Sequence, residues 1–221
     1  MSLAKNNPLT VALPRYSRAE EIANSLTHGV GILLSIAGLA ILTSFASVFG
    51  TAWHIVSVSI YGATQITLYT ASTLYHSITS PRAKAVLRIF DHSAIFLLIA
   101  GTYTPFALVN LRGPWGWSLF GVVWGLAAIG IAIQGVLIRQ KGFLTALPYI
   151  GMGWLALIAI RPLWPRLPVA GWLWLIAGGL AYTAGAAFFA AERVRYGHFV
   201  WHVFVLIGTT CHFFAVLWYS V

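Results

Sequence analysis

Seven stretches of about 20 predominantly apolar residues follow one another along this 221-residue chain. A run of that length is what an α-helix needs to cross the hydrocarbon core of a bilayer. Because 59% of the residues are hydrophobic and only 8% are charged, the chain lacks the polar surface of a soluble domain, which carries about 25% charged residues. The sequence therefore predicts an all-α integral membrane bundle with spans at 26–48, 54–76, 91–110, 116–138, 143–160, 170–190 and 199–220.

The chain divides into a short polar segment and one bundle. Residues 1–25 hold five charges and no apolar stretch of signal-peptide length, so we expect a retained cytoplasmic segment with a short amphipathic lead-in helix. Residues 26–221 are expected to form one seven-helix domain, because the connections between the spans are brief and contain turn residues. Pro105 and Pro148 lie within spans and predict kinks there.

Basic residues are distributed unevenly between the two sides of the predicted bundle. Ten of the 13 Lys and Arg residues fall on one side, and Arg112, Arg161 and Arg166 fall on the other. The positive-inside rule then places the N-terminus in the cytoplasm and, with an odd number of spans, the C-terminus outside. Because the net charge of +9 is scattered singly between apolar runs, we expect contact with anionic membrane lipids and no nucleic-acid partner.

Small residues and cysteine say less about function. Gly121 and Gly125 form a GxxxG pair, which permits close helix contact. We expect that contact within one chain rather than in a dimer, and the sequence leaves the oligomeric state open. The single cysteine, Cys211, excludes an internal disulfide and a Cys-rich metal site.

Two histidines have the spacing of metal ligands. Ionisable residues in membrane spans are costly and tend to be functional. His198 and His202 are separated by four residues, so both imidazoles lie on one face of a helix about one turn apart. That spacing suits two ligands of one metal ion, although interfacial histidines with the same spacing can simply reach toward water.

The predicted topology brings further polar residues to the same leaflet. Ser72 and His76 lie near the cytoplasmic end of the second span, Asp91 begins the third, and His198 and His202 begin the seventh. Three neutral imidazoles with an open fourth position are typical of a zinc site that keeps room for water. Asp91 would orient an imidazole or deprotonate that water, but its position also suits a helix N-terminal charge that the macrodipole favours.

Three other residues rank as reserve site candidates. His92 adjoins Asp91 but points about 100° away around the helix. Glu21, Asn24 and His28 share one helical face in the same leaflet, and an amphipathic lead-in helix explains this face as well as a site does.

Two histidines are expected to be structural. His54 lies at the opposite interface. His212 is roughly 21 Å along the helix axis from His198, which is too far to share one ion. We expect His212 to make a buried hydrogen bond.

The polar residues stand within longer motifs. These are Glu21-Ile-Ala-Asn24-Ser-Leu-Thr-His28-Gly29, Ala71-Ser72-Thr-Leu-Tyr75-His76, Phe90-Asp91-His92, Ala100-Gly101-Thr-Tyr-Thr-Pro105-Phe106, Gly151-Met152-Gly153-Trp154, His198-Phe-Val-Trp-His202 and Cys211-His212-Phe213. Over nearly the whole chain from Tyr16 onward, the sequence resembles the hemolysin III family of bacterial inner-membrane proteins. That family is related to the progestin and adipoQ receptors and to the alkaline ceramidases.

The resemblance implies a seven-helix bundle with its N-terminus inside. It implies Zn²⁺ bound toward the cytoplasmic side by three histidines, which match His76, His198 and His202. Asp91 and Ser72 match an acid and a serine that help to hold a zinc-bound water in the wider superfamily. The chemistry that these relatives suggest is hydrolysis of an amide in a lipid substrate, and nothing in these residues resembles a secreted pore former.

The leading hypothesis is a zinc-dependent hydrolase of a lipid or acyl substrate in the bacterial inner membrane, with a role in membrane-lipid homeostasis. Asp91 would take the proton and Ser72 would hydrogen-bond the developing oxyanion or the water, while substrate enters sideways between the helices. The alternatives are a lipid-sensing receptor with structural zinc and, less favoured, a transporter, channel or cytolytic protein. Transport is less favoured because the ionisable residues gather in one leaflet instead of crossing the bilayer.

Overall fold

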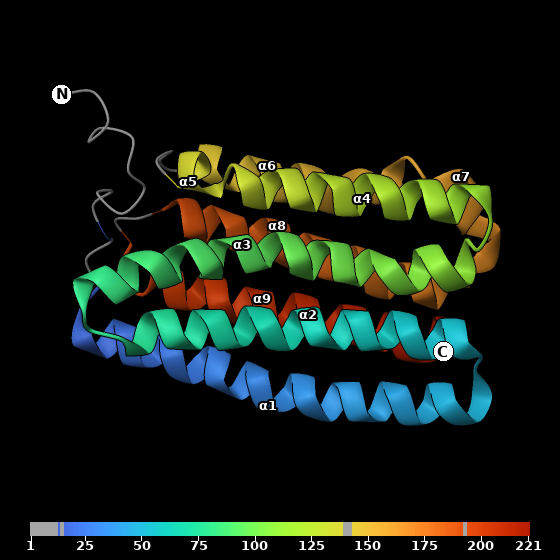
Figure 1. The fold of residues 1–221 in the computed structure, drawn as a ribbon, viewed down its shortest axis with the longest axis horizontal. Coiled ribbons are helices and arrows are strands. Elements are labelled where there is room, and N and C mark those ends of the chain that lie inside the picture. The colour runs from blue at the N-terminus through green and yellow to red at the C-terminus, as the bar shows by residue number, and fades with distance from the viewer. Residues whose placement is uncertain (1–12, 14–15, 139–142, 192–193) are drawn as a thin grey trace.

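The computed structural model describes residues 13, 16–138, 143–191 and 194–221. Every regular element in these ranges is helical, which confirms the all-α fold, and the main helices run side by side along one long axis (Figure 1). The helices are α1 (Arg18–Phe49), α2 (Ala52–Ser77), α3 (Pro81–Pro105), η3 (Phe106–Asn110), α4 (Pro114–Ala132), α5 (Gln134–Leu137), α6 (Phe143–Gly153), η4 (Trp154–Leu157), α7 (Ile160–Leu163), η5 (Trp164–Arg166), α8 (Val169–Ala190) and α9 (Gly197–Tyr219).

Two helices begin earlier than the apolar runs predict. α1 begins at Arg18 and not at residue 26, so the lead-in helix is continuous with the first span. A capping box fixes this start: Ser17 N–H donates to Glu20 Oε2 at 2.8 Å, and Glu20 N–H donates to Ser17 Oγ at 3.3 Å. α3 begins at Pro81 and not at residue 91, with proline at a position where its missing N–H costs nothing. Hydropathy finds the apolar part of a helix, and these helices continue beyond it.

Five of the described helices are long and apolar enough to cross a membrane. A sixth candidate is the pair Leu144–Leu157 and Ile160–Arg166, if its two bent halves form one span. α2 has 26 residues but is not among these candidates. It packs against both α1 and α3, and many of its buried residues are polar, which lowers its hydropathy. The expected count of seven spans therefore stays a prediction.

The chain departs from straight α-helix at Pro105, as predicted, but not at Pro148. Pro105 ends α3, and a π-helical turn, η3, follows it directly. Pro148 lies inside α6, which remains helical up to Gly153. The pronounced bend of this segment, 51°, falls after the tight 3-10 turn η4, about ten residues beyond Pro148. The kink predicted at Pro148 is therefore displaced toward the break between η4 and α7.

No described residue packs closely on the GxxxG pair of α4, so the intrachain contact expected there is not found in this part of the chain. A Cβ atom added at Gly121 or Gly125 would meet nothing within 4 Å among the described residues. Other glycines of α4 are closely covered: a Cβ at Gly130 would lie 2.5 Å from the Phe96 ring, and a Cβ at Gly116 would lie 2.1 Å from the carbonyl oxygen of Ala107 and 2.6 Å from that of Leu111. Backbone atoms cannot yield as side chains do, so only glycine fits there.

In the contact between α8 and α9, a side-chain ring of each helix packs over a glycine of the other helix. His212 of α9 covers Gly178 of α8, where an added Cβ would lie 2.5 Å from its Nε2. Tyr182 of α8 covers Gly208 of α9, where an added Cβ would lie 2.7 Å from the ring. Each helix therefore carries a ring and, four residues before it, a glycine that accepts the ring of the other helix.

We predict that Gly116→Ala destabilises the bundle, because the added methyl collides with backbone carbonyls and overpacking costs about 1–3 kcal/mol. Thermal unfolding of the detergent-solubilised protein, followed by tryptophan fluorescence, measures the effect. Gly121→Ala on the same helix is the matched control and should not lower the Tm. Equal Tm values for both variants would contradict the close approach at Gly116.

Candidate metal centre

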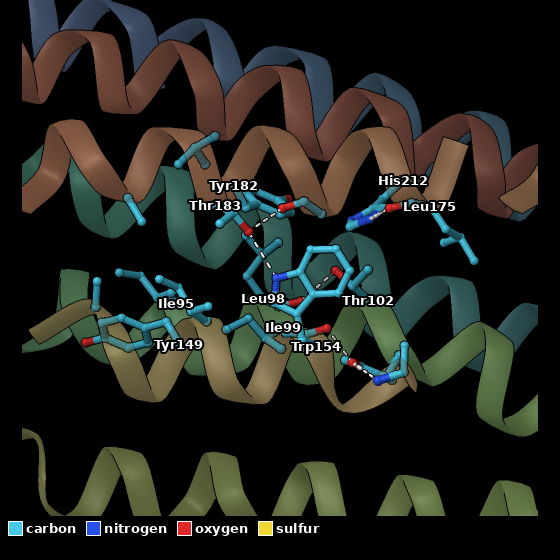
Figure 2. A pocket seen from close by; sticks show the side chains of 18 of the residues that line it. Ile95, Leu98, Ile99, Thr102, Tyr149, Trp154, Leu175, Tyr182, Thr183 and His212 are labelled. Carbon is cyan, nitrogen blue, oxygen red and sulfur yellow. Dashed lines mark hydrogen bonds between the residues drawn. The ribbon is translucent and has the colours of Figure 1, made fainter. Parts of the chain in front are cut away.

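A long cavity runs inside the bundle between α3, α6, α8 and α9. Its volume is about 240 Å³, and its lining is predominantly apolar. His198 and His212 both line it; they are fourteen residues apart on α9, so the cavity extends for about 21 Å. Figure 2 shows its middle part, where side chains of α3, the α6–η4 segment and α8 surround the space.

Polar groups in the middle of the cavity are largely hydrogen-bonded to the protein. Trp154 Nε1–H donates to Thr183 Oγ1 at 3.0 Å (Figure 2). His212 Nε2–H donates to the carbonyl oxygen of Leu175 at 3.3 Å, which confirms the buried hydrogen bond expected of His212. The middle of the cavity therefore offers mainly apolar surface to a ligand.

The cavity reaches the outer surface of the bundle between the bent α6–α7 segment and α8. Leu157 and Ile160 line it from the bent segment, and Ile176 lines it from α8. These side chains are also exposed on the outside, Leu157 by 56% and Ile176 by 45%. Apolar side chains of this part of the cavity wall are therefore accessible at the surface of the bundle.

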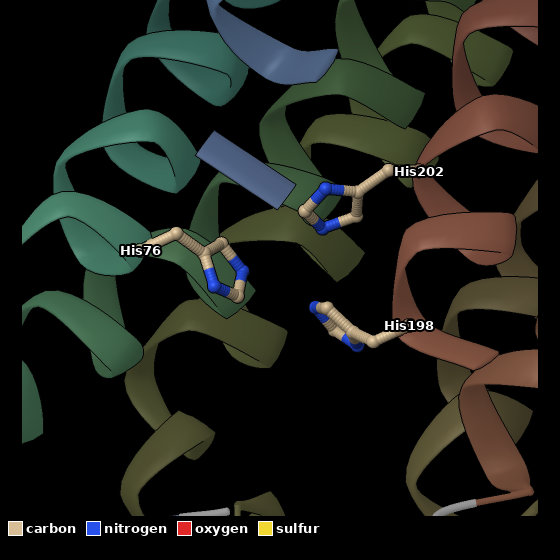
Figure 3. Close-up of side chains that lie close together, drawn as sticks. All are labelled: His76, His198 and His202. Carbon is tan, nitrogen blue, oxygen red and sulfur yellow. The ribbon is translucent and has the colours of Figure 1, made fainter. Parts of the chain in front are cut away.

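Three histidines meet at one end of this cavity. His76 lies in the last turn of α2, and His198 and His202 lie in the first two turns of α9 (Figure 3). One ligand nitrogen from each lies within 4.8 Å of the other two. His76 and His202 are only 3% and 1% exposed. The structure thus brings together the three residues that the sequence proposed as metal ligands.

The hydrogen bonds of two imidazoles leave Nε2 available to a metal. His76 Nδ1–H donates to Glu21 Oε2 at 2.7 Å, and His202 Nδ1–H donates to the carbonyl oxygen of Asn24 at 3.2 Å. A neutral imidazole that donates from Nδ1 carries its lone pair on Nε2. Within the described part of the chain, neither His76 Nε2 nor His198 Nε2 has a hydrogen-bond partner, although both are buried. Buried nitrogens with free lone pairs, facing one another, fit a Zn²⁺ ion.

Glu21, a reserve site candidate from the sequence, contacts one of the three clustered histidines. Its Oε2 accepts from His76, and its Oε1 accepts from Lys84 Nζ at 2.6 Å. A carboxylate that accepts from the outer nitrogen of a metal-binding histidine fixes the ring's orientation. The structure therefore places Glu21 one contact away from the histidine triad.

The other reserve histidines lie beside the cluster. The His28 ring stacks on His202, with centroids 3.6 Å apart. His92 Nδ1 lies 3.5 Å from Asp91 Oδ2. Neither belongs to the group of three whose nitrogens converge.

Asp91 and Ser72 face the same end of the cavity as the histidines. Both line the cavity together with His198 and His202. Asp91 is 7% exposed. Ser72 Oγ is buried and has no hydrogen-bond partner among the described residues. The cavity therefore ends in a carboxylate, a free hydroxyl and imidazoles.

A strained residue sets the start of α9. Tyr196 has φ 58°, the left-handed conformation, and is the sole non-glycine residue with positive φ in the described ranges. Its N–H donates to Glu20 Oε1 at 2.9 Å. The Tyr16 ring lies 5.1 Å from that of His198, measured between centroids. Glu20 in the first turn of α1 and Tyr16 just before this helix thus contact the first residues of α9 and the residue that precedes them.

Sequence reasoning missed Lys84 and the cavity. Lys84 is one of the ten basic residues that set the predicted orientation, yet it is buried and contacts Glu21. A signal was available, because Lys84 and Asp91 are seven residues apart and so share one face of α3. His54, expected to be structural, accepts at Nδ1 from Thr51 N–H at 3.0 Å and caps α2.

The fold and the site together define a multi-pass helical membrane protein with a buried cluster of three histidines at the end of an apolar cavity. The chain belongs to the haemolysin-III-related family, whose model matches residues 16–213.

Three relatives illustrate the similarity. The chain is 48% identical to "Hemolysin-3" of Bacillus cereus over 200 residues, which cover 90% of this chain and 91% of that protein. It is 46% identical to "Hemolysin-3 homolog" of Bacillus subtilis over 202 residues, which cover 91% and 95%. It is 25% identical to the human "Monocyte to macrophage differentiation factor" over 203 residues, which cover 89% and 83%.

We predict about one zinc per chain in the purified protein, and little or none in the variant His198→Ala/His202→Ala, because one remaining imidazole is too few for a stable site. Metal analysis of detergent-purified protein prepared without chelators measures this. His54→Ala, at the other end of α2, should retain the metal. Equal, negligible metal in the wild type and the double variant, with the fold intact, would reduce the cluster to a polar network.

Proposed function

We propose that this protein is a zinc-dependent hydrolase that cleaves an amide or acyl bond in a membrane lipid and contributes to membrane-lipid homeostasis. One observation carries the proposal: the histidine cluster, Asp91 and Ser72 lie where a long, laterally open apolar cavity ends. A lipid with its chain in the cavity would present its head to these groups.

His76, His198 and His202 would hold the metal through their imidazole nitrogens. A zinc ion in such a site supplies a Lewis acid that polarises a carbonyl oxygen and makes water more acidic. Asp91, as a buried carboxylate, would accept the proton of the attacking water. The Ser72 hydroxyl would donate a hydrogen bond to the carbonyl oxygen as negative charge develops on it.

The cavity supports a substrate with one long apolar chain. Its length of about 21 Å along α9 and its apolar walls match an extended acyl chain. Desolvating such a chain contributes favourably in proportion to the apolar area buried. Entry between the bent α6–α7 segment and α8 would let a lipid arrive from the bilayer without crossing water.

The site is proposed to face the cytoplasm of a bacterial cell, in its cytoplasmic membrane. α2 would be the remaining span, because it lies between α1 and α3 along its length and buries its polar side chains inside. Arg82 and Lys84 begin α3 at the histidine end. Arg139, Lys141 and Arg193, which contributed to the predicted orientation, lie outside the described residues. The two Bacillus relatives support a bacterial membrane.

A lipid-binding receptor with a structural zinc is the second candidate, because a cavity of this kind would hold a lipid whether or not it is cleaved. Retention of stoichiometric zinc and of bound lipid by a protein that cleaves no member of a broad acyl-lipid panel would favour it.

We predict that Asp91→Asn retains zinc but lowers the hydrolysis rate by about 10²- to 10⁴-fold, since asparagine cannot take the proton of water. Release of fatty acid from N-acyl and O-acyl lipids, quantified by mass spectrometry, measures the rate. Ser72→Ala should lose less activity, because it removes one hydrogen bond. Full activity with asparagine at position 91 would remove Asp91 as the base.

Narrowing the cavity should shorten the preferred acyl chain. A Cβ at Gly179 would make ordinary contact with Trp154, at 3.6 Å, so the rest of a leucine side chain there would fill cavity space. We predict that Gly179→Leu lowers the ratio of long-chain to short-chain turnover by about tenfold or more. Gly121→Leu, on the open face of α4, is the control. An unchanged ratio would argue that the chain does not occupy this cavity.

A further inference from the structure

Lys84 lies where three helices meet beside the histidine cluster. It belongs to the first turn of α3, and it is 63 residues from Glu21 of α1. Its ammonium donates to Glu21 Oε1 at 2.6 Å, and also to the carbonyl oxygens of Tyr75 at 3.2 Å and Ile78 at 3.5 Å, at the end of α2. An ammonium has three donors, so all three are engaged.

The position of this cation is unusual for lysine. Its side chain is only 11% exposed, and the ammonium also lies 4.9 Å from the centre of the Tyr75 ring. Lysine is rarely buried unless it is paired. The pairing is with a carboxylate whose second oxygen contacts His76 at 2.7 Å. Lys84, Glu21 and His76 thus form a continuous chain of charge-assisted hydrogen bonds that ends at the cluster.

We propose that Lys84 is a positioning residue of the metal centre. It holds Glu21 against His76, so that the His76 ring presents Nε2 toward His198 and His202, and it thereby sets the affinity for Zn²⁺. This inference rests on the proposed function, because it requires a metal at the three histidines.

Lys84 can act on His76 through Glu21, because removing Lys84 takes away one hydrogen-bond donor of the Glu21 carboxylate. Its side chain is 19% exposed, so it has a path to water. With Lys84 in place, both carboxylate oxygens of Glu21 accept hydrogen bonds from groups inside the bundle, one from His76 and one from Lys84. Without it, one oxygen loses its donor, and the side chain turns outward to recover hydrogen bonds with water. His76 then loses the contact that fixes its ring orientation.

Lys84 also caps the end of α2, and a purely structural role must be distinguished from the positioning role. The last carbonyl oxygens of a helix lack partners within it, and a lysine can satisfy them. A cap would affect folding stability whatever the state of Glu21. A positioning residue affects metal affinity only while Glu21 is present to transmit it.

A double-mutant cycle on the full-length, detergent-solubilised protein separates these roles. The variants are Lys84→Met, Glu21→Gln and the double variant, with Lys84→Arg as the conservative replacement and the exposed Arg82→Met in the same turn as the matched control. Zn²⁺ affinity is measured by competition with a chromophoric chelator, and Tm is measured for each variant. Visible spectra of the Co²⁺-loaded proteins report the ligand field without reference to turnover.

Lys84→Met and Glu21→Gln should each weaken Zn²⁺ binding by about 10- to 100-fold, the range found for partners of metal-binding residues. The double variant should bind no more weakly than Glu21→Gln alone. Lys84→Arg should recover most of the affinity, and Arg82→Met should match the wild type. If Lys84→Met does not fold, Lys84→Gln replaces it, since glutamine keeps two N–H donors for the carbonyls of α2 but lacks the charge.

The inference is overturned if the Lys84 variants lower Tm but leave Zn²⁺ affinity and Co²⁺ spectra unchanged, or if the two single effects simply add. The first result would assign Lys84 to capping alone, the second would show that its effect on Zn²⁺ affinity does not pass through Glu21, and both would leave the proposed function standing. A wild-type protein that binds no zinc would overturn the proposed function, and this inference with it.

Discussion

The Glu21 carboxylate is the contact on which the geometry of the histidine end depends. From the first turn of α1 it accepts from His76 at the end of α2 and from Lys84 at the start of α3. The same stretch of α1 reaches α9, because the Asn24 carbonyl accepts from His202. Buried polar groups in such an environment must be paired, so these contacts fix where four helix ends lie. The convergence of imidazoles in Figure 3 is a result of that pairing.

The cavity and the polar end form one unit with opposite chemical demands. Apolar walls favour a long chain and exclude water, whereas the end offers imidazoles, a carboxylate and a hydroxyl. Such a division is what the proposed function requires, since the chain of a lipid would meet the apolar walls and its head the polar end. The lateral opening beside Ile176 suits a molecule that is already dissolved in the bilayer.

Local patterns predicted the parts of the site that depend on helical spacing. The four-residue spacing of His198 and His202 places both on one face of α9, and helix direction alone brought His76 to the same end. Contacts between helices were not predictable in this way. Lys84 and Glu21 pair only because α1 and α3 both pack against α2, and the bend of the fifth predicted span falls after η4, about ten residues beyond Pro148. The prediction from the GxxxG pair failed for the same reason: glycine spacing identifies a smooth helix face but not what covers it, and the closely covered glycines of α4 are Gly116 and Gly130.

The packing of a ring of each helix over a glycine of the other, in the pair α8 and α9, restricts the motion of the cavity wall that these helices form. His212 sits over Gly178, and Tyr182 sits over Gly208, so sliding one helix along the other would drive two rings into neighbouring backbone at once. Shear between these helices, one of the two common modes of helix rearrangement, is therefore blocked. The opposite wall is interrupted by a 51° break between η4 and α7, and the hydrogen bonds with Tyr103 of α3 and Thr183 of α8 hold the part that precedes this break. A hinge at this break would move α7 and η5 while α8 and α9 stay together, so the histidines on α9 would keep their places.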